Sequence, residues 1–147
     1  MGAHPYFYFV KYQDDADKAL QELRKREFAA GRSNPVMPFL DFPLGPGSPA
    51  PGARHRSIEE AMEASDADGT RSILDLQTVG DSPDFCVACR VPDERLLDLF
   101  ETTEPTHEMI EQNMEFFEEI ERGQGIYMVV YKDGKPDELF FAGYSFD

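Results

Sequence analysis

The sequence predicts an α+β fold: a single domain spanning residues 1–147, with a mainly antiparallel sheet of about five strands and about four helices. Strand-like runs arrive in sequential pairs between helical stretches, whereas a parallel doubly wound sheet needs a helix between every two strands. The chain has 147 residues, which is the length of one ordinary domain. It is 41% hydrophobic and 12% aromatic, so a packed core is expected rather than an acidic disordered chain.

The first two elements are a strand and a helix. Residues 6–12 are β-branched and aromatic at both parities apart from Lys11, which predicts a strand buried on both faces in the interior of the sheet. A helix should follow, with Asp14 as its N-cap and Gly31 as its stop, because apolar residues recur between them at helical spacing.

Residues 32–56 contain six of the eleven prolines and three glycines, so neither a helix nor a ladder strand can run through them. We expect a long loop. Its residues 36–44 are too apolar to be left in water and should pack along the domain. Residues 45–53 are rich in Gly, Pro and Ser and should be mobile.

The middle of the chain predicts a short helix and a hairpin. Ser57 and Glu60 form a capping box that starts a helix ending near Asp66. Residues 72–79 and 85–91 are β-rich and are separated by the turn-forming sequence GDSPD. The simplest pairing of these two strands is an antiparallel hairpin.

The C-terminal third predicts two helices and two strands. A short helix begins at residues 92–94 and ends near Phe100, and Thr106 caps a longer helix that runs to Arg122. Strands at 126–132 and 139–146 close the chain. Pro136 in the intervening segment favours a connection of several residues over a two-residue turn.

Two segments carry a family resemblance. The sequence ALQELRKREFAAGRSNPV contains an EFxAGRxxPV stretch, and SIEEAMEASDADGTRSILDL contains a GTxSILD stretch. In this first half the chain resembles small uncharacterised bacterial α+β proteins with the same two segments. The resemblance implies one domain and no particular activity. Arg outnumbers Lys by nine to five, as is common for GC-rich bacterial genomes.

A soluble, cytoplasmic location is expected. The start, MGAHPYFYFVKYQDD, has no basic region ahead of an apolar stretch, and no apolar run approaches the ~18 residues of a membrane span. Two cysteines are too few for a disulfide framework, which fits a reducing compartment.

The acidic charge lies almost entirely in one part of the chain. Residues 1–56 carry eight Lys and Arg against six Asp and Glu, whereas residues 57–147 carry six against twenty-three, a net charge of −17. A field of that sign repels nucleic acids and anionic membranes and attracts basic partners. We therefore expect a basic protein partner, no nucleic acid or membrane, and a monomer or homodimer.

The sequence contains no catalytic constellation and no cofactor motif. Cys86 and Cys89 fall within a predicted strand, where residues three apart point to opposite faces, so we expect reduced thiols without a metal. His107 lies in the first turn of a predicted helix, where the macrodipole should lower its affinity for protons. In the predicted hairpin, Asp75 and Arg90 would lie near each other as a cross-strand ion pair.

The predicted helix from Thr106 to Arg122 carries the most distinctive surface. Glu111, Glu115 and Glu118 follow one another at positions i, i+4 and i+7, so one face is anionic. Such a face is either solvated or a docking surface. The residues that would bind a partner are Glu108, Glu111, Glu115, Glu118 and Glu119.

These observations favour a non-enzymatic interaction protein, such as an immunity protein or an inhibitor of a toxin that acts on nucleic acids, that binds a basic partner. The first alternative is an enzyme or small-ligand binder with a pocket between the sheet and the proline-rich loop, which would use Tyr8, Asp75, Arg90 and Tyr127. The second is a homodimer formed through an apolar sheet edge or residues 36–44.

Overall fold

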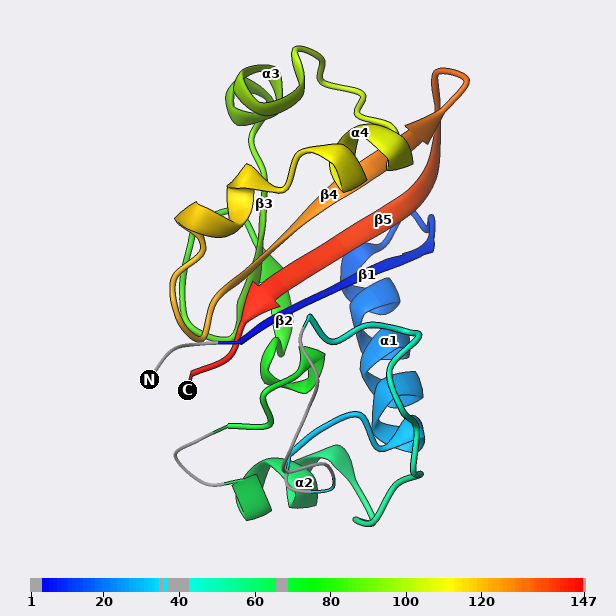
Figure 1. Cartoon of the computed structure of the whole chain (residues 1–147), viewed down its shortest axis with the longest axis vertical. Coiled ribbons are helices and arrows are strands. Elements are labelled where there is room, and N and C mark those ends of the chain that lie inside the picture. Colours follow the sequence, from blue (N-terminus) through cyan, green and yellow to red (C-terminus); the bar gives the residue numbers. More distant parts are fainter. Residues whose placement is uncertain (1–3, 35, 37–42, 66–68, 147) are drawn as a thin grey trace.

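A computed structural model describes residues 4–34, 36, 43–65 and 69–146 and contains one five-stranded sheet (Figure 1). The strands lie in the order β1-β5-β4-β3-β2. The pairs β1/β5 and β5/β4 are antiparallel, whereas β4/β3 and β3/β2 are parallel. The α+β class and the five strands are confirmed, but the sheet is mixed rather than mainly antiparallel. The strands span Pro5–Lys11 (β1), Thr78–Gly80 (β2), Val87–Arg90 (β3), Gly125–Lys132 (β4) and Lys135–Tyr144 (β5).

Strand β1 lies at an edge of the sheet, so the predicted interior position is wrong. Both of its parities are apolar because both faces of the sheet are covered: Tyr6 and Tyr8 face one core cluster, and Phe7 and Phe9 face the other. The outer edge of β1 is paired locally with Leu44, whose carbonyl accepts from Phe7 N at 3.1 Å. Apolar residues on both faces of a strand therefore indicate that both faces of the sheet are covered, not that the strand is central.

Helix α1 (Ala16–Ala30) covers the first face of the sheet. It begins one residue later than expected, because Asp15 rather than Asp14 caps it by accepting from Lys18 N. It ends as predicted at Gly31, whose φ of +77° is a left-handed conformation that suits glycine. Leu20 and Leu23 pack into the cluster formed with Tyr6, Tyr8 and β5.

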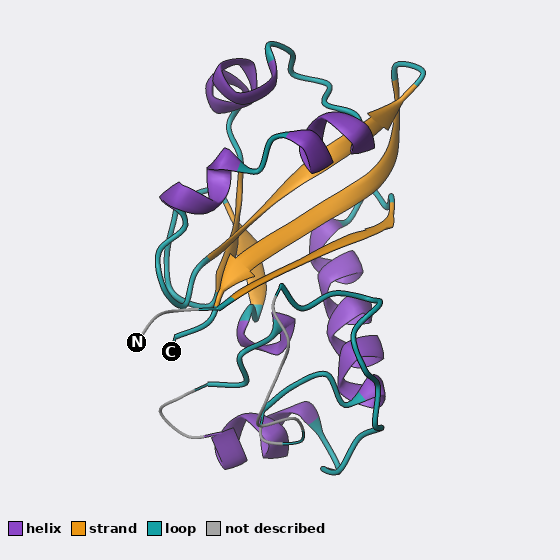
Figure 2. Cartoon of the chain, in the orientation of Figure 1, coloured by secondary structure: helices purple, strands orange, loops and turns teal. Residues whose placement is uncertain are grey.

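The second face of the sheet is covered by the crossover between the parallel strands β3 and β4 (Figure 2). Leu96, Leu99, Ile110 and Phe116 from this crossover pack against Met128 and Phe140 of the sheet. The crossover contains α3 (Asp93–Phe100), α4 (His107–Gln112) and the 3-10 helix η3 (Glu115–Glu119).

The predicted helix from Thr106 to Arg122 breaks at Asn113. Thr106 caps the helix as expected, but Asn113 has extended backbone angles and its side chain donates to Leu99 O at 2.8 Å. Its side-chain oxygen also accepts from Glu115 N. Asparagine competes with helical hydrogen bonds in this way, so the chain turns and η3 packs Phe116 onto Phe140.

Residues 72–79 and 85–91 do not form a hairpin. Instead Ser72 caps the 3-10 helix η2 (Ile73–Asp75), and Asp75 accepts from both N and Oγ1 of Thr70. Only Thr78–Gly80 is left to pair, and it pairs with β3 in parallel. The side-chain hydrogen bonds of Ser72 and Asp75 thus override the β propensity of this segment.

The connection between β4 and β5 is a two-residue turn at Asp133 and Gly134, not the longer connection predicted. Both residues have positive φ, +54° and +76°, as a type I′ turn requires. Pro136 is accommodated opposite Tyr131, next to an irregularity in the register after Val130. A bulge of this kind is where proline is tolerated in a sheet.

The described residues between α1 and α2 (Ile58–Ser65) form no helix or strand. Ser57 caps α2 by accepting from Glu60 N, as predicted. Leu44 is fully buried, whereas the other apolar residues expected to pack, apart from Val36, lie outside the described residues. In the part of the chain that the structure describes, no helix combines the length and the apolar character needed to cross a membrane.

Candidate functional site

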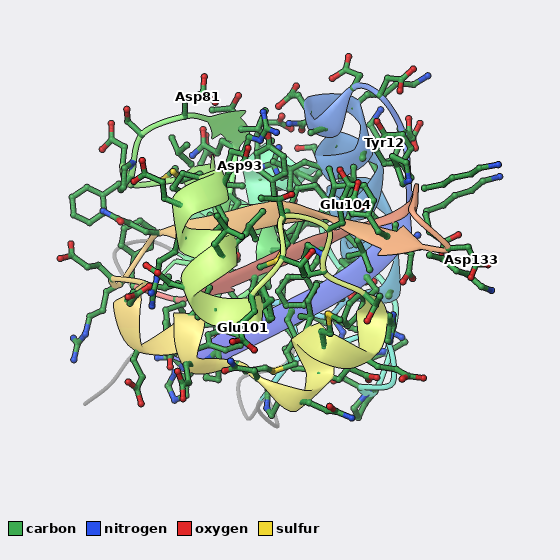
Figure 3. The ribbon with its side chains drawn as sticks, turned by 90° about the horizontal axis from the view of Figure 1, so that it is seen from above. Tyr12, Asp81, Asp93, Glu101, Glu104 and Asp133 are labelled. Atoms are coloured by element: carbon green, nitrogen blue, oxygen red, sulfur yellow. The ribbon has the colours of Figure 1, made fainter. Side chains whose placement is uncertain are left out.

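The crossover between β3 and β4 is strongly acidic. Residues 91–124, here called the acidic layer, contain eleven Asp and Glu against two Arg, a net charge of −9. Seen from the end that carries α3, Asp93, Glu101 and Glu104 belong to this layer, and Asp81 and Asp133 lie toward the edges of the same view (Figure 3). More than half of the excess charge of residues 57–147 is thus carried on one face of the sheet.

The five glutamates predicted to bind a partner all lie in this layer but do not share a helix face. Glu108 and Glu111 are on α4, whereas Glu115, Glu118 and Glu119 are on η3 beyond the break at Asn113. The i, i+4, i+7 arrangement is therefore not formed. All five residues are exposed.

Two of these glutamates are already engaged. Glu119 forms a two-pronged ion pair with Arg95 of α3, in which Arg95 Nε lies 2.7 Å from Glu119 Oε2 and Nη2 contacts Oε1. Glu111 Oε1 lies 3.3 Å from His107 Nε2. Among the residues that the structure describes, Glu108, Glu115 and Glu118 are not paired with Arg95 or His107, so of the five they are the best placed for a partner.

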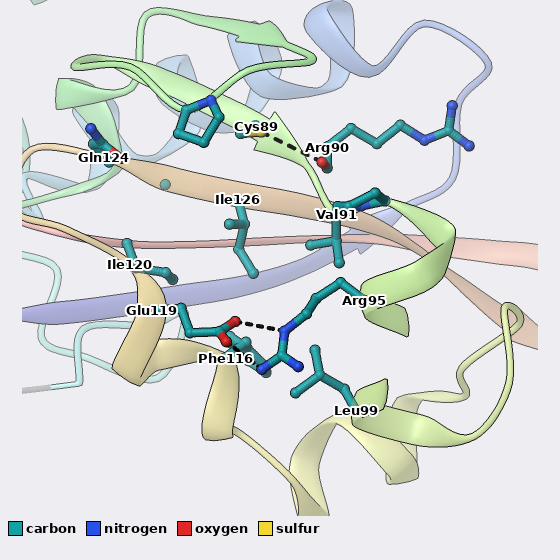
Figure 4. A pocket seen from close by; sticks show the side chains of 13 residues that line it. Cys89, Arg90, Val91, Arg95, Leu99, Phe116, Glu119, Ile120, Gln124 and Ile126 are labelled. Carbon is teal, nitrogen blue, oxygen red and sulfur yellow. Dashed lines mark hydrogen bonds and ion pairs between the residues drawn. The ribbon is translucent and has the colours of Figure 1, made fainter. Parts of the chain in front are cut away.

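An apolar pocket of about 180 Å³ opens between α3, η3 and the sheet (Figure 4). Cys89 and Ile126 lie at its sheet side, Val91 and Leu99 on the α3 side, and Phe116 on the η3 side. The Arg95–Glu119 ion pair joins the two helical walls. This pairing, across 24 residues of sequence, holds the walls in register.

Sequence reasoning missed this pocket. It identified Cys89 as a small buried residue of a sheet, and Cys89 is indeed buried. Burial raises the pKa of the Cys89 thiol, and the charge of Asp81 raises it further, so the thiol is protonated at neutral pH. The sequence feature that could have drawn attention to this region is Arg95, because it is one of only two basic residues in the acidic layer.

The four alternative ligand residues do not converge on one site. Tyr8 is buried beside Glu27, and burial, then the charge of Glu27, raises the pKa of its hydroxyl well above the usual range. Asp75 is buried under Thr70, and burial raises its pKa although the Thr70 hydrogen bonds oppose this. Because the hairpin is not formed, Asp75 does not lie opposite Arg90.

Arg90 and Tyr127 are neighbours, since they face each other in the β3/β4 register. Burial raises the pKa of Tyr127, while the charge of Arg90 lowers it. The Arg90 side chain points away from the pocket, which it lines with backbone (Figure 4). A shallow hollow of about 420 Å³ does lie between Phe7 of β1 and residues 43–49, but none of the four alternative residues lines it.

His107 occupies a polar hollow between α4 and the β4–β5 end of the sheet. Its ring stacks on Phe9 with 3.7 Å between centroids, and its Nδ1 lies 2.7 Å from Glu138 Oε1. Burial lowers the pKa of His107, but the hydrogen bond and charge of Glu138, together with Glu111, outweigh burial and raise it. The net shift of the His107 pKa is therefore opposite to the lowering expected from the helix dipole.

The described residues hold no group of three His, Cys, Asp or Glu side chains placed to bind a metal ion. The two cysteines have different surroundings: Cys86 lies near Asp75 and Gln77, and Cys89 lies at the pocket. Comparison of the chain with family models, with curated proteins and with solved structures finds no match.

Proposed function

We propose that this chain is a protein-interaction module that binds a basic protein partner through its acidic layer. The observation that carries the proposal is the charge of that layer, eleven carboxylates against two Arg in the crossover that covers one face of the sheet. Like charges placed side by side destabilise a fold and are easier to understand where a partner neutralises them.

The layer also exposes apolar side chains. Leu97 of α3 is 50% exposed and Met109 of α4 is 41% exposed. Single exposed apolar residues are ordinary, but here they stand among carboxylates. Apolar contacts at the centre and charged groups at the rim are the usual composition of a protein–protein interface.

A partner that acts on nucleic acids would present the matching surface. Proteins that bind nucleic acids carry clustered Lys and Arg to contact phosphates. A layer of carboxylates can occupy that basic surface and exclude the phosphate backbone. An immunity protein or an inhibitor of a nucleic-acid-directed toxin is therefore the function that the charge distribution supports best.

The test uses the three glutamates that are exposed and not paired with Arg95 or His107. The variant Glu108→Gln/Glu115→Gln/Glu118→Gln removes three charges from the acidic layer. The matched control, Glu22→Gln/Glu59→Gln/Glu63→Gln, removes three exposed charges from α1 and α2. Each protein is immobilised and exposed to lysate of the organism that carries the gene, at low and high salt.

We expect the wild type and the control to retain the same basic protein, and the layer variant to retain less of it. A screened charge pair at about 8 Å contributes roughly 0.2 kcal/mol, so three lost pairs weaken binding about threefold. Purified partner and biosensor kinetics then show whether the loss lies in the association rate, as electrostatic steering requires. Equal retention by all three proteins at both salt concentrations would refute the proposal.

A further inference from the structure

We propose that the pocket between α3 and η3 receives one apolar side chain from a basic segment of the partner protein. The proposal rests on the proposed function, because it places an anchoring contact inside the acidic layer. It commits to one occupant: a peptide segment in which a leucine- or phenylalanine-sized side chain is flanked by Lys and Arg.

The size of the pocket selects a side chain rather than a cofactor. Its volume is about 180 Å³. Drug-sized ligands and cofactors occupy pockets of roughly 300–1,000 Å³, whereas a cavity of about 150 Å³ accommodates benzene. One aromatic or branched aliphatic side chain therefore fits, and a nucleotide or a flavin does not.

The lining of the pocket selects an apolar occupant. Val91, Leu99 and Phe116 belong to the buried cluster on this face, and Ile126 packs against it. The Cys89 thiol is protonated, as argued above, and lies 3.5 Å from Arg90 O, so it presents no charge to the pocket. An inserted charged side chain would lose hydration without gaining a partner deep in the pocket.

The rim of the pocket selects basic neighbours for that side chain. Three carboxylates act on the Arg95 guanidinium: Glu119 is paired with it, Asp98 Oδ2 lies 3.7 Å from its Nη1, and the charge of Glu115 also acts on it. Glu119 and Asp98 are exposed, and Arg95 is only partly so. After the Arg95 charge is matched, a net charge of −2 remains near the pocket to attract Lys or Arg next to the anchor.

The probe is a fluorescein-labelled nonapeptide, KRKRXRKRK, with X as Leu or Ala, and its binding is followed by fluorescence anisotropy. We expect the wild type to bind the Leu peptide about tenfold more tightly than the Ala peptide, the effect of burying one leucine side chain. Both affinities should fall as salt is raised.

The pocket-filling variant Cys89→Phe should remove the preference for Leu while leaving the salt dependence unchanged. Ile120→Phe, on the pocket wall, serves the same purpose if Cys89→Phe does not fold, as judged by a cooperative thermal transition. The matched control Ile58→Phe adds the same kind of bulk on α2 and should keep the preference. The triple Gln variant should weaken both peptides alike and also keep it.

The possible results separate the two proposals. Salt-dependent binding with equal affinity for both peptides overturns the pocket and leaves the acidic docking surface standing. If neither peptide binds the wild type at low salt, or if the triple Gln variant binds both peptides as tightly as the wild type does, the proposed function fails as well. Self-association in sedimentation that Cys89→Phe abolishes would overturn the proposal too, because the occupant would be a second copy of this chain.

Discussion

Breaking the ion pair between Glu27 and Arg32 from one side should destabilise this fold more than breaking an exposed ion pair. The Glu27 side chain is fully buried at the end of α1, and Arg32 Nη1 lies 2.8 and 3.1 Å from its two oxygens. Arg32 also donates to Ser48 O and Pro46 O, so it ties the segment after α1 to the helix.

Removing Arg32 alone leaves a buried carboxylate without its partner. At about 3 Å and an effective dielectric constant of about 20, the attraction is roughly 5 kcal/mol, and desolvation offsets part of it. We expect Arg32→Met to lower the free energy of unfolding by about 3–5 kcal/mol. The double variant Glu27→Gln/Arg32→Met should lose at least about 2 kcal/mol less than the sum of the single variants, because no charge is left buried.

Urea unfolding of the wild type, both single variants and the double variant measures this coupling. Arg26→Met is the matched control: Arg26 is 59% exposed and its Nε lies 4.0 Å from Glu27 Oε2, so the change should cost less than about 1 kcal/mol. If Arg32→Met costs no more than Arg26→Met, or if the two single effects simply add, the reasoning is refuted.

Two further predictions concern His107 and Gly31. The pKa of His107 is raised in the folded state, so protonated His107 stabilises the fold at pH values below the pKa of the unfolded chain, about 6.5. This contribution is lost as the pH rises through the folded pKa. His107→Gln should therefore cost about 0.5 kcal/mol more at pH 5.5 than at pH 8.5 in urea unfolding, and an equal cost would contradict the assignment. Gly31→Ala should lower stability by more than about 2 kcal/mol, because its Cβ would lie 2.3 Å from Gly52 O at a φ of +77°. Gly134→Ala, with φ +76° and open space around it, should cost only about 1 kcal/mol, and equal thermal shifts for the two would rule out the clash.

Local signals in the sequence predicted three of the helix ends. Gly31 stops α1, Ser57 caps α2 and Thr106 caps α4, each through contacts within a few residues. Such contacts form between neighbours in the chain, so their geometry follows from residue type and spacing. The hydrogen bond between the Asn113 side chain and Glu115 N is equally local, so the break at Asn113 could have been predicted from it. The bond from Asn113 to the Leu99 carbonyl could not, because Leu99 belongs to another helix.

The candidate site depends on contacts that cannot be predicted from the spacing of residues in the sequence. The excess acid was visible, and it proved to lie mainly on one layer because residues 91–124 form one crossover. The pocket requires Cys89 and Ile126 from adjacent strands and the Arg95–Glu119 pair from two helices. None of these partners is within a helical turn of the other.

By itself the sequence determined the α+β class, the approximate positions of most elements, the caps and the acidic character of the C-terminal part. These depend on propensity, short-range hydrogen bonds and charge, which act within a few residues. Only the tertiary structure decided the edge position of β1, the parallel pairing of β2 with β3, and the pocket. The apolar residues of a strand indicate that its faces are covered. They do not indicate which strands lie next to it, because every strand offers the same backbone groups for pairing.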